Sequence, residues 1–187
     1  MENVKIDDLI RNEKKRRQIV EAMVMGKIFI YPTDTIYGIG CNAMDSEVVR
    51  RIREIKSSNQ PFSVIVPSKG WIKQYLVPKG KFLNRLPGPY TFIYKKRNPD
   101  FLNIVSKSDS LGVRIPRHVF SELVCEAGVP FVTTSVNLSG QQHVMNVDEI
   151  PESIKPSVDF IVDAGQLNNQ PSKIIDLTSN EPKVLRE

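Results

Sequence analysis

Three clusters of polar side chains follow short apolar runs along the chain. They are Pro32-Thr33-Asp34-Thr35-Ile36-Tyr37-Gly38, Lys56-Ser57-Ser58-Asn59-Gln60-Pro61 and Thr133-Thr134-Ser135-Val136-Asn137-Leu138-Ser139-Gly140. Their hydroxyls, amides and one lysine supply the hydrogen-bond donors and the compact positive charge that a phosphate-bearing ligand requires. If the preceding strands are neighbours in one sheet, the three clusters line one cleft. Taken singly, each cluster is more typical of a turn or a helix cap.

Arg114 lies in Gly112-Val113-Arg114-Ile115-Pro116, an apolar run that predicts a short strand. Because side chains alternate across a strand, we expect Arg114 to point to the opposite face from Val113 and Ile115. If that face is the cleft, the guanidinium can bind a carboxylate through two parallel hydrogen bonds. A surface ion pair is the alternative interpretation.

Several familiar motifs are absent. The chain has no Gly-x-x-x-x-Gly-Lys-Ser/Thr, no Gly-x-Gly-x-x-Gly, no paired histidines and no Gly-x-Ser-x-Gly. P-loop, Rossmann, zinc-hydrolase and α/β-hydrolase interpretations therefore lack their defining residues. Cys41 and Cys125 are far apart, so we expect two reduced thiols in or near the core rather than a zinc site or a disulfide.

Helices and strands must position these residues, and their predicted order is irregular. Apolar residues at helical spacing predict helices over 5–25, 47–55, 71–75 and 119–127. Apolar β-prone runs predict strands over 27–31, 62–66, 90–94, 112–115, 129–134, 160–162, 174–177 and 183–185, with residues 33–40 in a loop. Irregular alternation of this kind predicts an α/β fold with a mixed sheet flanked by helices.

Composition narrows the class of protein. The 187 residues suit one domain, and 40% hydrophobic with 25% charged content is typical of a soluble globular chain. No apolar run approaches the roughly 18 residues of a membrane span, and the N-terminus lacks the apolar segment of a signal peptide, so we expect a cytoplasmic location and no membrane partner.

The net charge of +5 is compatible with a nucleic-acid partner and with an ordinary surface. The basic run Lys14-Lys15-Arg16-Arg17 is expected as a solvated helix face, with an RNA contact as the alternative.

Six motifs become specific when they are taken together and in order. They are Pro-Thr-Asp-Thr-x-Tyr-Gly-x-Gly (32–40), Leu-Pro-Gly-Pro-x-Thr (86–91), Gly-Val-Arg-Ile-Pro (112–116), Ser-x-Asn-x-Ser-Gly (135–140), Pro-Ser-x-x-x-Asp (171–176) and Val-Leu-Arg (184–186). Over residues 20–187 the chain resembles the YrdC family of threonylcarbamoyl-AMP synthases. The resemblance implies one YrdC-like domain over 1–187 without an additional C-terminal domain, a twisted mixed sheet and a deep basic cavity.

The resemblance also implies a reaction, in which L-threonine, bicarbonate and ATP give threonylcarbamoyl-AMP and pyrophosphate for a tRNA modification. Mg²⁺ would accompany ATP, and no carboxylate cluster predicts a dedicated metal site. A downstream threonylcarbamoyl-transferase complex would use the product, and tRNA or double-stranded RNA is a further candidate partner.

Site residues follow from the resemblance, position by position. The resemblance assigns threonine binding to Thr35, Arg114, Thr133 and Ser172, and it places Arg114 at the threonine carboxylate. The ATP positions are Lys56, Gln60, Ser110, Ser135, Asn137, His143 and Arg186, and the catalytic candidates among them are Lys56, Ser135 and Asn137. Adenylyl transfer requires neutralised phosphate charge more than a nucleophilic side chain, and these residue types supply it.

One position departs from the family pattern, because Ser58 stands where the family usually has an arginine. A serine cannot replace a bidentate phosphate contact, so we consider Arg53 and Arg97 as substitutes. The departure leaves open a diverged paralogue that binds RNA or nucleotide without catalysis. An enzyme that delivers a carbamoyl-adenylate to another acceptor is a third hypothesis.

Overall fold

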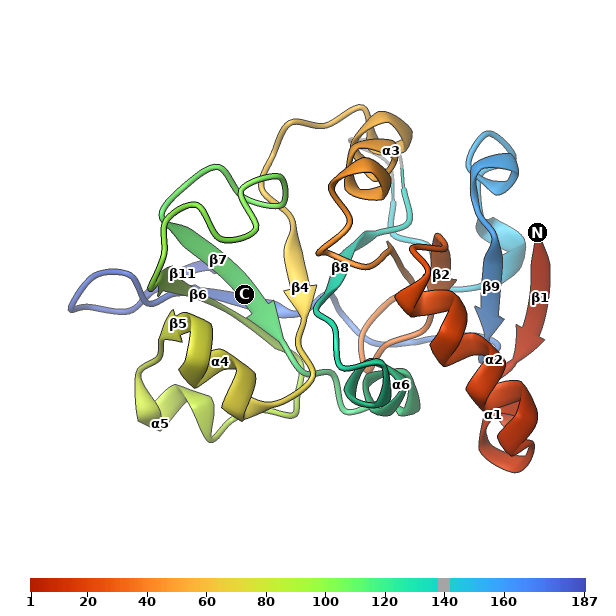
Figure 1. Ribbon diagram of the computed structural model, residues 1–187, viewed down its shortest axis with the longest axis horizontal. Helices are drawn as coiled ribbons and strands as arrows, with labels where there is room; N and C mark the ends of the chain where they lie inside the picture. Colours follow the sequence, from red (N-terminus) through yellow and green to blue (C-terminus); the bar gives the residue numbers. More distant parts are fainter. Residues whose placement is uncertain (138–141) are drawn as a thin grey trace.

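A computed structural model describes residues 1–137 and 142–187 of the chain. Residues 138–141, which include Ser139 and Gly140 of the third polar cluster, lie outside the described residues. Within the described residues, the strands form one mixed sheet in the order β1-β9-β2-β3-β8-β4-β7-β6-β10-β11, with β5 paired to β6 (Figure 1). The strands are β1 (Glu2–Lys5), β2 (Phe29–Tyr31), β3 (Gly38–Gly40), β4 (Ser63–Ile65), β5 (Leu76–Val77), β6 (Tyr90–Lys96), β7 (Ser110–Arg114), β8 (Phe131–Ser135), β9 (Phe160–Asp163), β10 (Lys173–Asp176) and β11 (Lys183–Arg186).

Helices lie on both sides of this sheet, so the predicted α/β fold with a flanked mixed sheet is confirmed (Figure 1). The helices are α1 (Ile6–Arg11), α2 (Glu13–Val24), α3 (Ser46–Lys56), α4 (Lys69–Tyr75), α5 (Gly80–Leu83) and α6 (Val119–Ala127), followed by 3-10 turns at Val147–Glu149 and Lys155–Ser157. None of the helices that the structure describes is both long and apolar enough to cross a bilayer.

The two faces of the sheet bury alternate residues of the segment that contains β2. Ile28 and Ile30 pack in one core cluster with α3, whereas Phe29 and Tyr31 pack in a second cluster with α2 and α6. In the second cluster the Tyr31 and Phe120 rings stack with centroids 4.0 Å apart. Successive side chains of a strand point to opposite faces of the sheet. A strand that is covered on both faces therefore has apolar residues at every position.

The single helix expected over 5–25 is wrong, because Asn12 divides it. The backbone of Asn12 is extended, with φ of −120°, and its side chain accepts a hydrogen bond from Lys15 N at 3.0 Å, which starts α2. Asparagine favours this capping position over a helix interior. Residues before α1 form strand β1, which pairs with β9 about 158 residues away, a partner that no local pattern indicates.

The loop expected over 33–40 ends earlier than predicted, because Gly38–Gly40 forms β3 between β2 and β8. Gly-Ile-Gly lacks the branched residues that identify strands. A Cβ at Gly40 would lie 1.7 Å from the Val132 carbonyl oxygen, so only glycine allows this approach.

Of the two free cysteines, Cys41 is buried as expected, but Cys125 is exposed on α6.

Candidate functional site

The three polar clusters contribute to one cavity of about 190 Å³, the central cavity. It forms because β3, β8, β4 and β7 are consecutive in the sheet, which places Gly38 opposite Ser135 and Ser63 opposite Thr133. The first and third clusters share this cavity as predicted, whereas the second cluster contributes only Pro61 and none of its polar side chains. The lining residues are Thr33, Ile36, Tyr37, Gly38, Pro61, Phe62, Ser63, Thr91, Arg114, Thr133, Thr134, Ser135, Ser172, Ile174 and Arg186.

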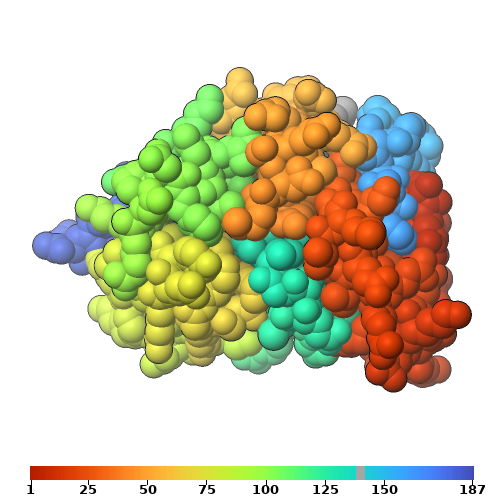
Figure 2. All heavy atoms as spheres, viewed as in Figure 1, coloured from red at the N-terminus to blue at the C-terminus, as the bar shows by residue number. Residues whose placement is uncertain are grey.

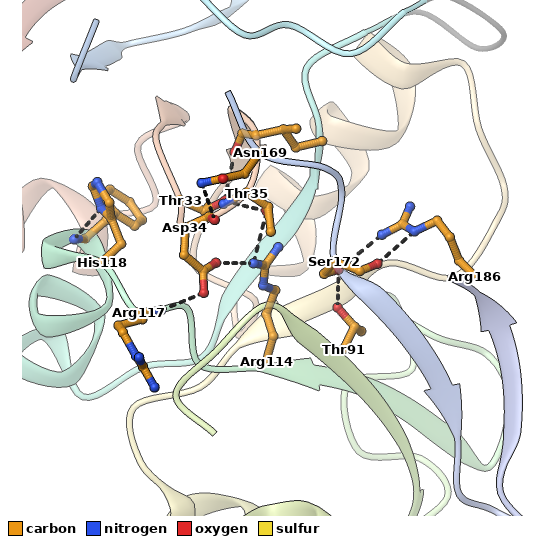
Figure 3. A network of polar contacts seen from close by, with 12 residues as sticks. Thr33, Asp34, Thr35, Thr91, Arg114, Arg117, His118, Asn169, Ser172 and Arg186 are labelled. Atoms are coloured by element: carbon orange, nitrogen blue, oxygen red, sulfur yellow. Dashed lines mark hydrogen bonds and ion pairs between the residues drawn. The ribbon is translucent and has the colours of Figure 1, made fainter. Parts of the chain in front are cut away.

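Arg114 points into this cavity, while Val113 beside it packs in the core, as the strand pattern predicts. Its Nη2 donates to Asp34 Oδ1 at 2.7 Å and to Thr35 Oγ1 at 3.2 Å (Figure 3). The side chains of Arg114 and Asp34 are 7% and 11% exposed, so this ion pair is buried rather than on the surface. Burial lowers the pKa of Arg114, although a guanidinium remains charged at any physiological pH.

The Thr-Asp-Thr turn after β2 is fixed from several sides. Thr33 Oγ1 lies 2.8 Å from Thr35 Oγ1 and donates to the Ile36 carbonyl at 2.8 Å. Asp34 Oδ2 accepts from Arg117 N at 2.9 Å, and Asn169 Nδ2 donates to the Asp34 carbonyl at 3.1 Å (Figure 3).

This turn separates the central cavity from a second hollow of about 450 Å³, the outer cavity, which Asp34, Thr35 and Asn169 help to line. Thr33, not the expected Thr35, lines the central cavity. Thr33 and Asp34 belong to the first polar cluster, although sequence reasoning gave them no individual role, and it missed Asn169.

Opposite Arg114, a second arginine is held beside Ser172. Arg186 Nε donates to the Ser172 carbonyl at 2.8 Å, and its Nη2 donates to Ser172 Oγ at 3.1 Å (Figure 3). Ser172 Oγ in turn lies 2.8 Å from Thr91 Oγ1, a contact that the sequence did not reveal. The pKa of Arg186 is lowered by burial and by the positive charge of Arg114. Among the described residues, the lining has two guanidinium groups and no carboxylate, which suits an anionic ligand.

Lys56 is the last residue of α3 and is buried, and it contacts the central cavity through Ser135 of the lining. Its Nζ donates to the Ser135 carbonyl at 2.7 Å, to Asn137 Oδ1 at 3.1 Å and to the Asn137 carbonyl. Ser135 Oγ also donates to Asn137 Oδ1, at 2.5 Å. The three catalytic candidates are therefore in mutual contact. Burial lowers the pKa of Lys56 to about 8.

His143 is exposed and lies within electrostatic reach of the same charges. Its pKa is lowered by partial burial and then by the positive charges of Arg186 and Lys56.

The remaining two ATP candidates, Gln60 and Ser110, line an adjoining cavity of about 370 Å³, which shares Pro61, Phe62, Ser63 and Ile174 with the central cavity. Small-molecule sites commonly enclose about 300–1,000 Å³, so the two cavities together have room for a nucleotide and a small co-substrate.

Neither arginine considered as a replacement at Ser58 faces these cavities. Arg53 has five N–H groups, and it donates five hydrogen bonds to the carbonyls of 58, 60, 104 and 105. Arg97 is exposed, and its Nε donates to the Lys73 carbonyl at 3.1 Å. Neither Arg53 nor Arg97 is therefore placed in this structure to supply the missing phosphate contact.

A metal cage is not found among the described residues, where no group of three or more His, Cys, Asp or Glu side chains is placed to hold an ion. Since the lining of the central cavity has no carboxylate either, these residues do not fit a resident Mg²⁺, which prefers carboxylate and phosphate oxygens.

Comparison with known proteins agrees with this geometry. The family model Sua5_yciO_yrdC, described as "Telomere recombination", matches residues 21–187. A relative from Methanocaldococcus jannaschii, named provisionally as a threonylcarbamoyl-AMP synthase, is 37% identical over 98% of this chain and 91% of its own length.

Two solved structures share the fold. P. abyssi Sua5 complexed with L-threonine superposes with a TM-score of 0.85 at 27% identity, covering 99% of this chain, which spans 56% of the P. abyssi chain. E. coli YciO superposes with a TM-score of 0.84 at 28% identity, covering all of this chain and 94% of its own.

Proposed function

Since the chain belongs to the Sua5/YciO/YrdC family, we propose that it is an L-threonylcarbamoyl-AMP synthase. The reaction joins L-threonine, bicarbonate and ATP into threonylcarbamoyl-AMP, pyrophosphate and water. The observation that carries the proposal is the pair Arg114 and Arg186, held in one cavity whose described lining residues include hydroxyl groups and no carboxylate. All three substrates are anionic or carry a carboxylate, so this cavity matches them in charge.

On the threonine side, Arg114 binds the substrate carboxylate, and Thr133 and Ser172 surround the remaining polar groups. Thr35 acts from the outer side through its hydrogen bond with Arg114. Arg114 Nε supports this role, because it is buried and has no hydrogen-bond partner among the described residues. A buried donor left unpaired costs roughly 1–3 kcal/mol, which a bound carboxylate would recover. The name of the P. abyssi complex, which contains L-threonine, also favours a threonine site in this fold.

On the nucleotide side, the candidates are those on and around the second polar cluster and the end of the chain: Lys56, Gln60, Ser110, Ser135, Asn137, His143 and Arg186. The threonine amine attacks the carbon of bicarbonate, whose hydroxyl leaves as water with a proton from the amine, giving a carbamate. An oxygen of the carbamate then attacks the α-phosphate of ATP as pyrophosphate leaves. Lys56 and Arg186 stabilise the negative charge of that transition state. Ser135 and Asn137 position Lys56, and because its Nζ already donates three hydrogen bonds to them, Lys56 acts through its charge rather than through a direct bond. Exclusion of water protects the carbamate and the mixed anhydride from hydrolysis.

Mg²⁺ enters this proposal only as a companion of the ATP phosphates, because the described residues offer no cage for it. The chain acts as one YrdC-like domain over 1–187 with a deep basic cavity, in the cytoplasm. Its product passes to a threonylcarbamoyl-transferase complex that modifies tRNA. These parts of the proposal rest on the family resemblance.

The direct test incubates the purified protein with labelled bicarbonate, L-threonine, ATP and Mg²⁺, and follows threonylcarbamoyl-AMP and pyrophosphate. If no product forms at enzyme concentrations comparable to those of the substrates, the proposal is wrong. That result would favour a paralogue that binds RNA or nucleotide without catalysis.

A pair of variants then tests the threonine assignment. Arg114→Ala should raise KM for threonine far more than KM for ATP. Arg117→Ala is the matched control, because Arg117 is exposed and reaches Asp34 only through its backbone N–H. Equal losses for threonine and ATP in Arg114→Ala would show that the assignment is wrong.

A further inference from the structure

The net positive charge of this chain arises from one stretch of the sequence. Residues 55–99 contain nine of the 26 lysines and arginines and none of the 21 aspartates and glutamates. The rest of the chain, with 17 basic and 21 acidic residues, has a net charge of −4. The modest overall charge of +5 therefore hides a strong asymmetry, which is a known indication of an interaction with a polyanion.

Seven of the nine basic residues are at the surface, and we call them the basic face. Lys56 and Lys96 are the two that are buried. Figure 1 shows α4, β5 and α5 together under one end of the sheet, and Figure 2 shows residues 69–85 as a continuous yellow area at the lower left. None of the seven forms an ion pair with any residue in the described ranges 1–137 and 142–187. The members are Lys69, Lys73, Lys79, Lys81, Arg85, Lys95 and Arg97.

The N-terminal basic run differs, because the fold itself neutralises it. Arg16 pairs with Glu126 at 2.5 Å and with Glu122 at 3.1 Å on α6, and Lys15 pairs with Glu2. Arg17 pairs with Glu13 at 3.2 Å. The run that the sequence singled out as an alternative RNA contact is thus largely an internal ion-pair network, and the unpaired charge lies elsewhere.

The backbone under the basic face is held by local contacts. Arg97 N donates to the Tyr75 carbonyl at 2.9 Å, and Arg97 Nε donates to the Lys73 carbonyl at 3.1 Å. These bonds join the end of β6 to α4. The Tyr75 ring also stacks on Phe101 with centroids 4.5 Å apart. The charges therefore sit on ordered elements.

Aromatic rings under the side chains also hold part of the basic face. Lys81 Nζ and the Arg85 guanidinium lie 5.3 and 5.5 Å from the centre of the Phe82 ring, and Arg85 lies 5.8 Å from that of Tyr90. Such cation–π contacts restrict long side chains. Less conformational entropy is then lost when they bind a partner.

The composition of the face favours nucleic acid over protein as the partner. A specific protein interface is built around an apolar core, with charged residues depleted there. Val77 is the large hydrophobic residue of this region that is strongly exposed, at 51%. Nucleic-acid interfaces are polar and strongly basic, and they contact phosphates that repeat along a backbone.

We propose that the basic face binds the phosphate backbone of folded RNA, outside the cavities of the reaction site. None of its seven residues lines the central or the adjoining cavity. The chain would hold RNA and small substrates at the same time, in a manner that does not depend on base sequence. The basic face would be the binding surface for the RNA partner in the proposed function. RNA binding to it does not require that the chain be a synthase.

The test measures the affinity of the full chain for a tRNA transcript and for a duplex RNA across a series of salt concentrations. The variant Lys69→Gln/Lys73→Gln/Lys81→Gln/Arg85→Gln removes four charges from the face. The matched control Arg11→Gln/Lys14→Gln/Arg50→Gln/Arg51→Gln removes four exposed charges elsewhere. Circular dichroism and the melting temperature check that both variants fold.

We expect the face variant to lose at least tenfold in affinity for both RNAs near 0.1 M salt, and the control to lose much less. Removing one lysine or arginine that neutralises a phosphate reduces the slope of log K against log salt by about 0.7–0.9, so removing four reduces it by about 3. Saturating ATP and threonine should not displace the RNA.

Three outcomes would overturn the proposal: equal losses in the two variants, no RNA binding by the unmodified chain, or stronger retention of poly-glutamate than of RNA. The last would point to an acidic protein partner instead. Turnover of threonine, bicarbonate and ATP, measured in parallel, should be unchanged in the face variant, so a failure of RNA binding and a failure of synthase activity are distinguishable.

Discussion

Asp34 and Arg114 form a buried ion pair, with Asp34 Oδ1 accepting from Arg114 Nη2 at 2.7 Å across 80 residues of sequence. The second carboxylate oxygen accepts from Arg117 N. Asp34 is therefore fixed at both oxygens, and it sets the orientation in which the Arg114 guanidinium faces the central cavity. In the proposed reaction Asp34 is a positioning residue, since it touches Arg114 rather than the reacting atoms.

Asp34→Asn should weaken threonine use while leaving ATP use nearly unchanged. The amide keeps one hydrogen bond but removes the charge that orients Arg114, so we expect KM for threonine to rise about tenfold, equivalent to about 1.4 kcal/mol. Steady-state kinetics with each substrate varied in turn will measure this split. If KM for threonine stays the same and the melting temperature falls, Asp34 has only a structural role.

Lys56 should give the proposed reaction an alkaline limit. Burial lowers its pKa to about 8, so the ammonium that attracts phosphate is present below pH 8 and is lost above it. We expect kcat/KM for ATP to fall about tenfold per pH unit above that point, because this ratio reports ionisation of the free enzyme. Lys56→Arg, if it folds, should remove the limit. If kcat/KM for ATP still falls in the same way above pH 8 in Lys56→Arg, the ionising group is not Lys56.

The same pKa shift predicts how stability varies with pH. Lys56 has a lower pKa in the folded chain than its usual 10.5, so the unfolded chain binds more protons between about pH 8 and 10.5. The contribution of Lys56 to the free energy of unfolding should therefore increase as pH rises through that interval. Urea unfolding of the unmodified chain and of Lys56→Met, compared at pH 7.5 and 10, will show whether the difference changes in this direction.

Ser58→Arg should increase the affinity for ATP. Arg53 on α3 is fully engaged with backbone carbonyls, so it does not supply the guanidinium that the family resemblance predicts at this position. We expect KM for ATP to fall several-fold, with KM for threonine unchanged. Arg97→Ala serves as a control that removes an exposed guanidinium outside the cavities. Unchanged ATP kinetics in Ser58→Arg would mean that another group already makes the contact.

Gly40→Ala should destabilise the fold severely. The added Cβ would lie 1.7 Å from the Val132 carbonyl oxygen, which also accepts from Tyr31 Oη at 3.0 Å and belongs to a central strand. We expect a loss of more than about 3 kcal/mol in the free energy of unfolding, measured by urea titration. Gly80→Ala is the control, because nothing lies within 4 Å of its added Cβ. Similar losses in both variants would contradict the steric explanation.

The sequence predicted those parts of the fold that depend on local pattern. Runs such as residues 27–31 and 129–134 correspond to β2 and β8 within two residues. The missed strands have no such signal: Gly38–Gly40 is two-thirds glycine, Leu76–Val77 has two residues, and Glu2–Lys5 is a strand only because β9 pairs with it.

The candidate site was predicted in a similar way. The motifs located Arg114, Ser135 and Arg186, and the structure places all three in the central cavity. Local sequence could not show that Thr91 contacts Ser172, 81 residues away. The assigned roles in threonine and ATP binding stay predictions.

The order of strands at one end of the sheet also constrains how the chain folds. Strand β9 lies between β1 and β2, and both pairings are parallel. During synthesis, β1 leaves the ribosome long before residues 160–163 exist to pair with it. Such distant pairings are slow to form and leave strand edges unpaired in the meantime. The N-terminal segment should therefore become protected from amide hydrogen exchange only in the last phase of folding.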